Sequence, residues 1–133
     1  MATVLVTGAT GHLGNVLVRE LIKCGQNVRV LVHPSDDLRA LQMLPIEVVY
    51  SDVRDDFSNA LSGVETLFHL ASIISITPSR KKQLYSVNVG GTENVISLAK
   101  RYRIPLIYVS SVHAFSEMGK GSIITEETPI DEN

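Results

Sequence analysis

The sequence has little of several features that would mark a particular class of protein. It contains a single cysteine among 133 residues, Cys24, so no internal disulfide can form, and no Cys/His spacing around it suits a zinc ion. No apolar run reaches the roughly 18 residues that a membrane span requires, and the first residues lack the basic region of a signal peptide. These absences favour a cytoplasmic protein in a reducing compartment.

The sequence also lacks a large excess of positive or negative charge. Twelve basic and fourteen acidic residues give a net charge of -2, with no basic stretch of the kind that binds nucleic acid. The composition is 44% hydrophobic and 20% charged, as in ordinary globular proteins, and 133 residues suffice for one domain with its own core. We therefore expect a single globular domain, with no nucleic acid and no membrane as partner.

Short runs of β-branched residues alternate with helical patterns along most of the chain. Strands are predicted at residues 4–7, 27–32, 46–50, 66–71 and 106–110. Helices are predicted at residues 13–23, 38–44, 55–61 and 80–102. This alternation is typical of an α/β protein of the Rossmann type, a doubly wound parallel sheet of about five strands with flanking helices.

Three glycines at steps of three, Gly8, Gly11 and Gly14, lie between the first predicted strand and the first predicted helix. In a nucleotide-binding turn they would allow a tight turn, close approach of the backbone to a pyrophosphate, and close packing of helix on strand. The amides at the start of the helix would face the same anion. Glycines used only for packing are the alternative, but the strand–turn–helix context favours a dinucleotide-binding loop.

The GxxGxxG spacing and four later segments resemble the extended short-chain dehydrogenase/reductases, a family that includes NAD-dependent epimerases/dehydratases and dihydroflavonol-reductase-like enzymes. The matching segments are TGATGHLG at 7–14, SDV at 51–53, FHLAS at 68–72, NVGGTENV at 88–95 and YVSSVHAF at 108–115. They keep the family's order and cover most of residues 4–115. The resemblance implies an NAD(P)-binding Rossmann domain over residues 1–133.

The resemblance also implies roles for individual positions. The cofactor would be contacted by three groups of residues: Gly8, Thr10, Gly11, His12, Leu13 and Gly14 in the glycine loop, Asp52 and Val53 at the adenine, and Leu70, Ala71 and Ser72 after the fourth strand. Asn88 would hold the active-site backbone or a proton-relay water. Ser111, four residues before Phe115, matches the catalytic serine that bonds the substrate oxygen.

Some of these polar residues also have ordinary structural explanations. Asp52 could be a simple strand-end aspartate. His69 lies inside an apolar strand, and we interpret it as a hydrogen-bonded core histidine without a chemical role. Asn88 is a poor helix former placed in a helix interior, which indicates that its amide bonds a specific partner.

The choice between NAD and NADP depends on the end of the second strand. An enzyme that uses NAD usually carries an acid there, about 20 residues after the glycines, to bind the ribose hydroxyls. The sequence has Val32 and His33 instead, and a histidine can donate to a 2'-phosphate, which favours NADP slightly. Asp36 or Asp37 folding back to the ribose would reverse that preference.

The family's catalytic tyrosine and lysine, a YxxxK pair after the serine motif, are missing, because no tyrosine of the chain has a lysine four residues on. The pair transfers the substrate proton, so we expect an inactive, cofactor-binding portion of a longer oxidoreductase or epimerase/dehydratase. A non-catalytic dinucleotide-binding regulatory protein of the same fold is the alternative. A homodimer is expected of a full-length protein rather than of this chain, which has only one of the two long dimer helices.

The loop from Ile73 to Pro78 would lie near the nicotinamide and is rich in isoleucine. Its apolar character argues against a heavily hydrogen-bonded sugar diphosphate as the substrate. The fifth strand has no following helix in this sequence, so we also expect exposed apolar surface beside it.

Overall fold

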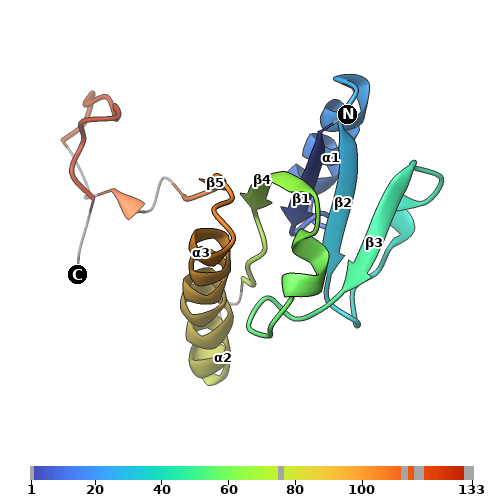
Figure 1. Cartoon of the computed structure of the whole chain (residues 1–133). Coiled ribbons are helices and arrows are strands. Elements are labelled where there is room, and N and C mark those ends of the chain that lie inside the picture. Colours follow the sequence, from blue (N-terminus) through green and yellow to red (C-terminus); the bar gives the residue numbers. More distant parts are fainter. Residues whose placement is uncertain (1, 75–76, 112–113, 116–118, 131–133) are drawn as a thin grey trace.

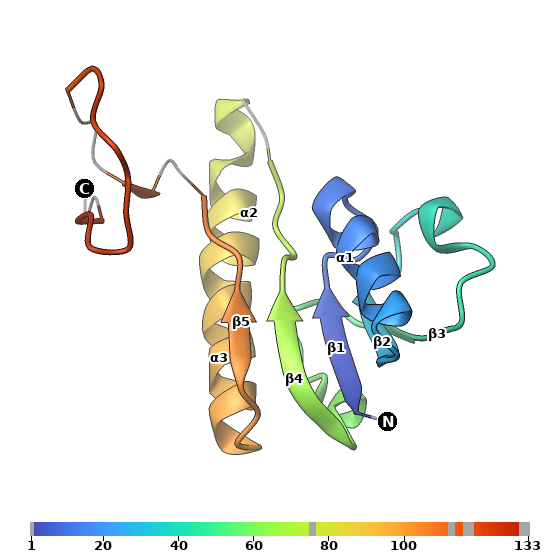
Figure 2. The same ribbon diagram turned by 90° about the horizontal axis from the view of Figure 1, so that it is seen from above.

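A computed structural model shows one parallel sheet flanked by helices, which confirms the predicted fold class (Figure 1, Figure 2). It describes residues 2–74, 77–111, 114–115 and 119–130. The five strands lie in the order β3-β2-β1-β4-β5, and each neighbouring pair is parallel. The strands are β1 (Thr3–Thr7), β2 (Asn27–Val32), β3 (Ile46–Tyr50), β4 (Val64–His69) and β5 (Leu106–Tyr108). The strand order reverses between β1 and β4, so a ligand is expected beyond the carboxyl ends of these two strands.

The helices divide between the two faces of the sheet, as Figure 2 shows for α1 and α3. The longest helical stretch joins four segments: η3 (Pro78–Arg80), α2 (Lys81–Tyr85), the π-helical η4 (Ser86–Gly90) and α3 (Gly91–Arg101). The others are α1 (His12–Lys23) and two 3-10 turns, η1 (Arg39–Leu41) and η2 (Ser58–Leu61).

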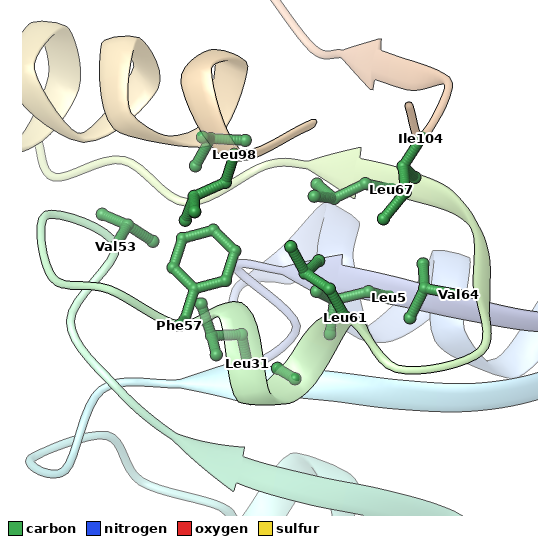
Figure 3. Packing of buried hydrophobic residues seen from close by; sticks show 11 residues of the cluster. Leu5, Leu31, Val53, Phe57, Leu61, Val64, Leu67, Leu98 and Ile104 are labelled. Atoms are coloured by element: carbon green, nitrogen blue, oxygen red, sulfur yellow. The ribbon is translucent and has the colours of Figure 1, made fainter. Parts of the chain in front are cut away.

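Strand β1 is buried on both faces, which explains its continuous apolar run. Leu5 packs on one face in a cluster with Phe57 and Leu67, beneath α3 (Figure 3). Val4 and Val6 pack on the other face with residues of α1 and β2. Each fully buried aliphatic or aromatic side chain of this kind contributes about 1.5–3 kcal/mol to folding, so the two cores fix the sheet that supports the site.

Two of the predicted helices are only single 3-10 turns in the structure. The segment 38–44 is helical only over Arg39–Leu41, because Met43 has φ 66° and Pro45 disfavours helical geometry at Leu44. The segment 55–61 is helical only over Ser58–Leu61, since the Asp56 carboxylate accepts a hydrogen bond from the Ser58 amide and competes with a helical turn there.

The helix predicted at 80–102 is present but not uniform. A π-helical turn, η4, occupies residues 86–90 and stands immediately before Gly91. A Cβ atom at Gly91 would lie 2.7 Å from Cγ2 of Val53, so this glycine allows the helix to pack closely on the loop after β3. π-Turns inside α-helices are rare and are often found at functional sites.

The end of the sheet at β5 is partly uncovered, as the sequence predicts. Ile107 and Tyr108 are 48% and 54% exposed. Beyond them, residues 119–130 lie apart from the sheet and helices (Figure 1), and an antiparallel bridge joins Ile130 to Phe115. Among the described residues no helix is both long and apolar enough to cross a membrane.

Candidate functional site

A tight turn built on Gly8 ends strand β1. Gly8 has φ 73°, a left-handed conformation that costs about 1–2 kcal/mol for a residue with a Cβ atom. A Cβ atom there would lie 2.5 Å from the carbonyl carbon of Leu70 and 2.6 Å from the amide of Ala71. Glycine is therefore required on both counts, and it brings β1 directly against the end of β4.

The other two glycines of the loop have different surroundings. A Cβ atom at Gly14 would overlap the carbonyl oxygen of Gly8, so Gly14 sets the close packing of α1 on the turn. At Gly11 the nearest atom to such a Cβ is the Gly8 oxygen at 3.4 Å, which leaves space above the loop. Gly11 is also the N-cap of α1, and His12 and Leu13 at the start of this helix line the cavity, as in an anion-binding loop.

A cavity of about 560 Å³ opens above the glycine loop, at the carboxyl ends of the strands. It is lined by all twelve positions expected to contact a dinucleotide: Gly8, Thr10, Gly11, His12, Leu13, Gly14, His33, Asp52, Val53, Leu70, Ala71 and Ser72. The structure thus brings together residues from four segments of the chain. That they bind a cofactor stays a prediction.

Charged side chains gather on the β2/β3 half of the cavity. Nε and Nη2 of Arg54 donate to the two carboxylate oxygens of Asp52 at 2.9 and 2.6 Å, and Nη1 donates to Oγ of Ser86 at 3.1 Å. Nε2 of His33 lies 3.4 Å from the same carboxylate. The hydrogen bond from Arg54 lowers the pKa of Asp52 to about 2, so this half of the cavity holds a fixed carboxylate near neutral pH.

The turn after β2 brings a second carboxylate to the cavity. Asp36 accepts a hydrogen bond of 2.9 Å from the backbone amide of His33, and both residues line the cavity. Nδ1 of His33 accepts a hydrogen bond from the amide of Ser35 at 3.1 Å, so both ring nitrogens have partners. Asp37 is paired with Arg39 and does not line the cavity.

The β4/β5 half of the cavity is mainly apolar. It is lined by Ile73, Ile74, Val87 and Val109, with Ser110 two residues after β5. Two residues of the isoleucine-rich loop thus lie where the sequence suggests, whereas residues 75 and 76 fall outside the described part of the chain.

Asn88 does not line the cavity but holds a residue that does. Its side-chain Nδ2 donates to the carbonyl of Ile73, and its Oδ1 accepts from the amide of Ile73, each at 2.9 Å. Asn88 lies in the π-turn, and this pair of bonds explains an asparagine in a helix interior. Ser110 lines the cavity, while Ser111 is exposed next to it, so the chemical role of Ser111 stays a prediction.

His69 is a hydrogen-bonded core residue, as its position in an apolar strand indicates. Its side chain is 1% exposed, with Nδ1 2.7 Å from Oγ1 of Thr7 and Nε2 3.0 Å from Oγ1 of Thr92. The ring also stacks on Tyr108, with centroids 5.9 Å apart. Burial lowers the pKa of His69 to about 4, so the ring is neutral at pH 7.

Several lining residues were not among those predicted to contact cofactor or substrate. Ser51, Val109 and Ser110 belong to the matching segments, whereas Leu31, Ser35, Arg54, Gln83 and Val87 lie outside them. Arg54 carried a usable signal, because a basic residue two positions after Asp52 can reach the carboxylate within one turn. Gln83 and Val87 carried none, since their approach to the cavity depends on how the long helix packs on the sheet.

The geometry fits an NAD(P) molecule. The absence of Cβ atoms at Gly8 and Gly14 forms the turn, the space above Gly11 admits a pyrophosphate, and the cavity has one charged and one apolar half. In the described part of the chain, no group of three or more His, Cys, Asp or Glu side chains could hold a metal ion.

Comparison with known proteins agrees with this geometry. Over 101 residues the chain is 46% identical to sterol demethylase protein B of Methylococcus capsulatus, which covers 74% of this chain and 31% of the relative. Over 124 residues it is 36% identical to a 3 beta-hydroxysteroid dehydrogenase/Delta 5→4-isomerase of Mycobacterium tuberculosis, covering 84% of this chain and 32% of that protein. The chain therefore spans about a third of the length of these curated relatives.

A solved structure with bound NAD has the same fold. A short-chain dehydrogenase/reductase superfamily protein from Agrobacterium tumefaciens, with bound NAD, superimposes with a TM-score of 0.81 at 27% identity, covering 98% of this chain and 39% of that one. The sequence model of the 3-beta hydroxysteroid dehydrogenase/isomerase family matches residues 5–133 of this chain. This chain belongs to the 3-beta hydroxysteroid dehydrogenase/isomerase family, and the resemblance to the extended short-chain dehydrogenase/reductases is confirmed.

Proposed function

We propose that this chain binds a nicotinamide dinucleotide in the cavity above the glycine loop and supplies the cofactor-binding part of an NAD(P)-dependent oxidoreductase or epimerase/dehydratase. The observation that carries the proposal is the gathering of all twelve expected cofactor positions around one cavity of about 560 Å³. The related Agrobacterium tumefaciens protein, which has bound NAD, supports it.

The two halves of the cavity suggest the orientation of the ligand. The adenosine would lie in the β2/β3 half, where Asp52 offers a carboxylate for the adenine amino group. The pyrophosphate would lie over Gly11, at the start of α1. The nicotinamide would then reach the apolar β4/β5 half, beside Ile73 and Val109.

We further propose that NAD is preferred to NADP. The ring of His33 already has partners in Asp52 and Ser35, and the Asp36 carboxylate lies at the end of β2. A 2'-phosphate would therefore face two carboxylates, while the guanidinium of Arg54, which also lines the cavity, is held by Asp52. These contacts support NAD as the proposed cofactor, in place of the NADP that His33 favours on its own.

The reaction would involve the apolar half of the cavity. The nicotinamide, when bound, accepts or donates a hydride at a carbinol or carbonyl carbon. Ser111 would hydrogen-bond the substrate oxygen, and Asn88 would position the backbone of Ile73. An alcohol or ketone on a largely apolar skeleton would suit the lining, and the steroid dehydrogenase among the relatives supports this substrate class.

The binding proposal is tested by calorimetric titration of the chain with NADH. Gly11→Ala should weaken binding at least tenfold, since the new methyl group fits the fold yet occupies the space for the pyrophosphate. Gly119→Ala is the matched control, because its Cβ would meet only Ser122 Oγ, at 3.8 Å, and Gly119 does not line the cavity. Equal affinity in Gly11→Ala and the unaltered chain would refute the proposed site.

A parallel titration with NADPH tests the preference. The unaltered chain should bind NADH more tightly than NADPH. Asp36→Ser should reduce the ratio of the two dissociation constants, because it removes a carboxylate from the surroundings of the 2'-phosphate. Tighter binding of NADPH than of NADH by the unaltered chain would refute the proposed preference for NAD and support a contact between His33 and the 2'-phosphate.

A further inference from the structure

A continuous hydrogen-bond network passes through His69 and joins three elements beneath the cavity. On one side, Oγ1 of Thr7 at the end of β1 lies 2.7 Å from Nδ1 of the ring. On the other, Nε2 lies 3.0 Å from Oγ1 of Thr92 in α3, whose hydroxyl donates to the carbonyl of Asn88 at 2.7 Å. The network thus runs from the glycine-loop strand through β4 to the π-turn.

The directions of these bonds are fixed from both ends. Oγ1 of Thr7 accepts from the amides of Leu70 and Ala71, each at 3.1 Å, which uses both lone pairs and leaves its proton for Nδ1. The proton of Thr92 is given to Asn88, so its oxygen must accept from the ring. Both ends require a neutral His69 with its proton on Nε2.

The two ends of the network hold the same cavity-lining loop. Thr7 anchors the amides of Leu70 and Ala71, which also lie against Gly8. Asn88 anchors both backbone groups of Ile73. Residues 70–73 all line the cavity, and His69 joins their two anchors.

Core packing alone does not explain the histidine. A leucine would fill a similar volume, but the buried hydroxyl of Thr7 and the part-buried oxygen of Thr92 would each lose a hydrogen-bond partner. The described buried side-chain polar atoms all have partners, so the network is complete as it stands. The ring is the one group in it that accepts on the β1 side and donates on the helix side.

We propose that His69 is a positioning residue for the dinucleotide site: through Thr7 and Thr92 it fixes the backbone of residues 70–73 in the geometry that receives the nicotinamide end of the cofactor. The inference rests on the proposed function for its ligand. The hydrogen-bond network itself is independent of that proposal.

The test compares variants at neutral pH in two ways. The first measurement, without ligand, is NMR of the ring nitrogens and of amide exchange at residues 70, 71 and 73. The second is the NADH dissociation constant by calorimetry. The variants are His69→Leu, Thr92→Val and the conservative Thr92→Ser. Val95→Ala serves as the control, because Val95 is fully buried in α3 but lies outside the network and the cavity lining.

We expect a protonated Nε2 and an unprotonated Nδ1 in the unaltered chain. His69→Leu and Thr92→Val should speed amide exchange in the loop and weaken NADH binding roughly tenfold, as the loss of about one hydrogen bond predicts. Thr92→Ser keeps the hydroxyl, so its loop amide exchange and its NADH dissociation constant should stay close to those of the unaltered chain. Val95→Ala should lower the overall stability and leave the dissociation constant unchanged.

The possible failures are distinguishable. A ring protonated on Nδ1, or a loop whose amide exchange is the same in His69→Leu, would overturn the network. Normal NADH binding by His69→Leu would overturn the positioning role. If the unaltered chain binds no NADH while the ring and loop behave as expected, the network is supported and the proposed ligand is wrong.

Discussion

The buried ring of His69 should make the stability of this protein depend on pH. The pKa of the folded ring is lowered to about 4 by burial, against an ordinary value of 6.5 in an unfolded chain. The hydrogen bonds act in the same direction, since Nδ1 accepts from Thr7, whose oxygen has no lone pair left for a protonated ring. Below the ordinary pKa the unfolded chain binds a proton that the folded chain does not.

The size of the effect follows from these two values. The contribution of His69 to stability is complete above about pH 6.5, falls as the pH falls, and levels off near pH 4, where the folded ring also titrates. Each pKa unit of difference is worth about 1.36 kcal/mol, so lowering the pH from 7 to 5 should remove about 2 kcal/mol. That is a large part of the stability of a small domain.

The assay is urea unfolding of the unaltered chain and of His69→Gln at several pH values between 7 and 5. The glutamine does not titrate, so the difference between the two proteins isolates the histidine. Asp52, with a folded pKa of about 2, stays ionised throughout this range and adds little. Parallel stability curves for the two proteins would refute the reasoning, as would an NMR titration that places the folded pKa of His69 near 6.5.

Other predictions concern the turn and the charged half of the cavity. Gly8→Ala should lower the free energy of unfolding by roughly 2–4 kcal/mol, whereas Gly25→Ala, with similar φ but open surroundings, should cost only about 1–2 kcal/mol; urea unfolding measures both. Arg54→Met should raise the pKa of Asp52 from about 2 toward 3.8, followed by NMR of the carboxyl carbon. Arg39→Met is the control, since Arg39 pairs with Asp37, and a pKa of Asp52 that stays near 2 in Arg54→Met would show another cause.

Much of the fold could be predicted because it depends on local patterns. Strand β1 is an unbroken apolar run, and such a run identifies a strand covered on both faces whatever its partners are. The glycine turn could be predicted for the same reason. The positive φ of Gly8 and the close packing at Gly14 each require a glycine, so the turn can be recognised from the spacing of these residues in the sequence. The short helices were overpredicted where local competitors, Pro45 and the Asp56 side chain, interrupt an otherwise helical pattern.

Many of the residues that line the cavity could be predicted from the sequence, but the hydrogen bonds between the elements around it could not. His69 and Thr92 are 23 residues apart, and nothing in either sequence context indicates that a strand and a helix will place them 3.0 Å apart. The partner of Asn88 was likewise unknown, although its poor helix propensity showed that one exists. The preference between NAD and NADP stays a prediction, because the position of the Asp36 carboxylate at the end of β2 depends on how the turn after the strand folds.

The π-turn at Ser86–Gly90 has a consequence for how this helix tolerates insertion and deletion. Each residue of an α-helix advances by about 100°, and a π-turn accommodates one residue more than an α-helical turn does. Removal of the extra residue there, other than Asn88, would therefore restore a regular α-helix and keep α2 and α3 in nearly the same relative rotation. Removal of one residue from α3 has no such compensation, and it would rotate α2 by about 100° relative to the end of α3, so that Gln83 would leave the cavity wall. The π-turn is thus the place in this helix where a deletion moves the cavity-lining residues least.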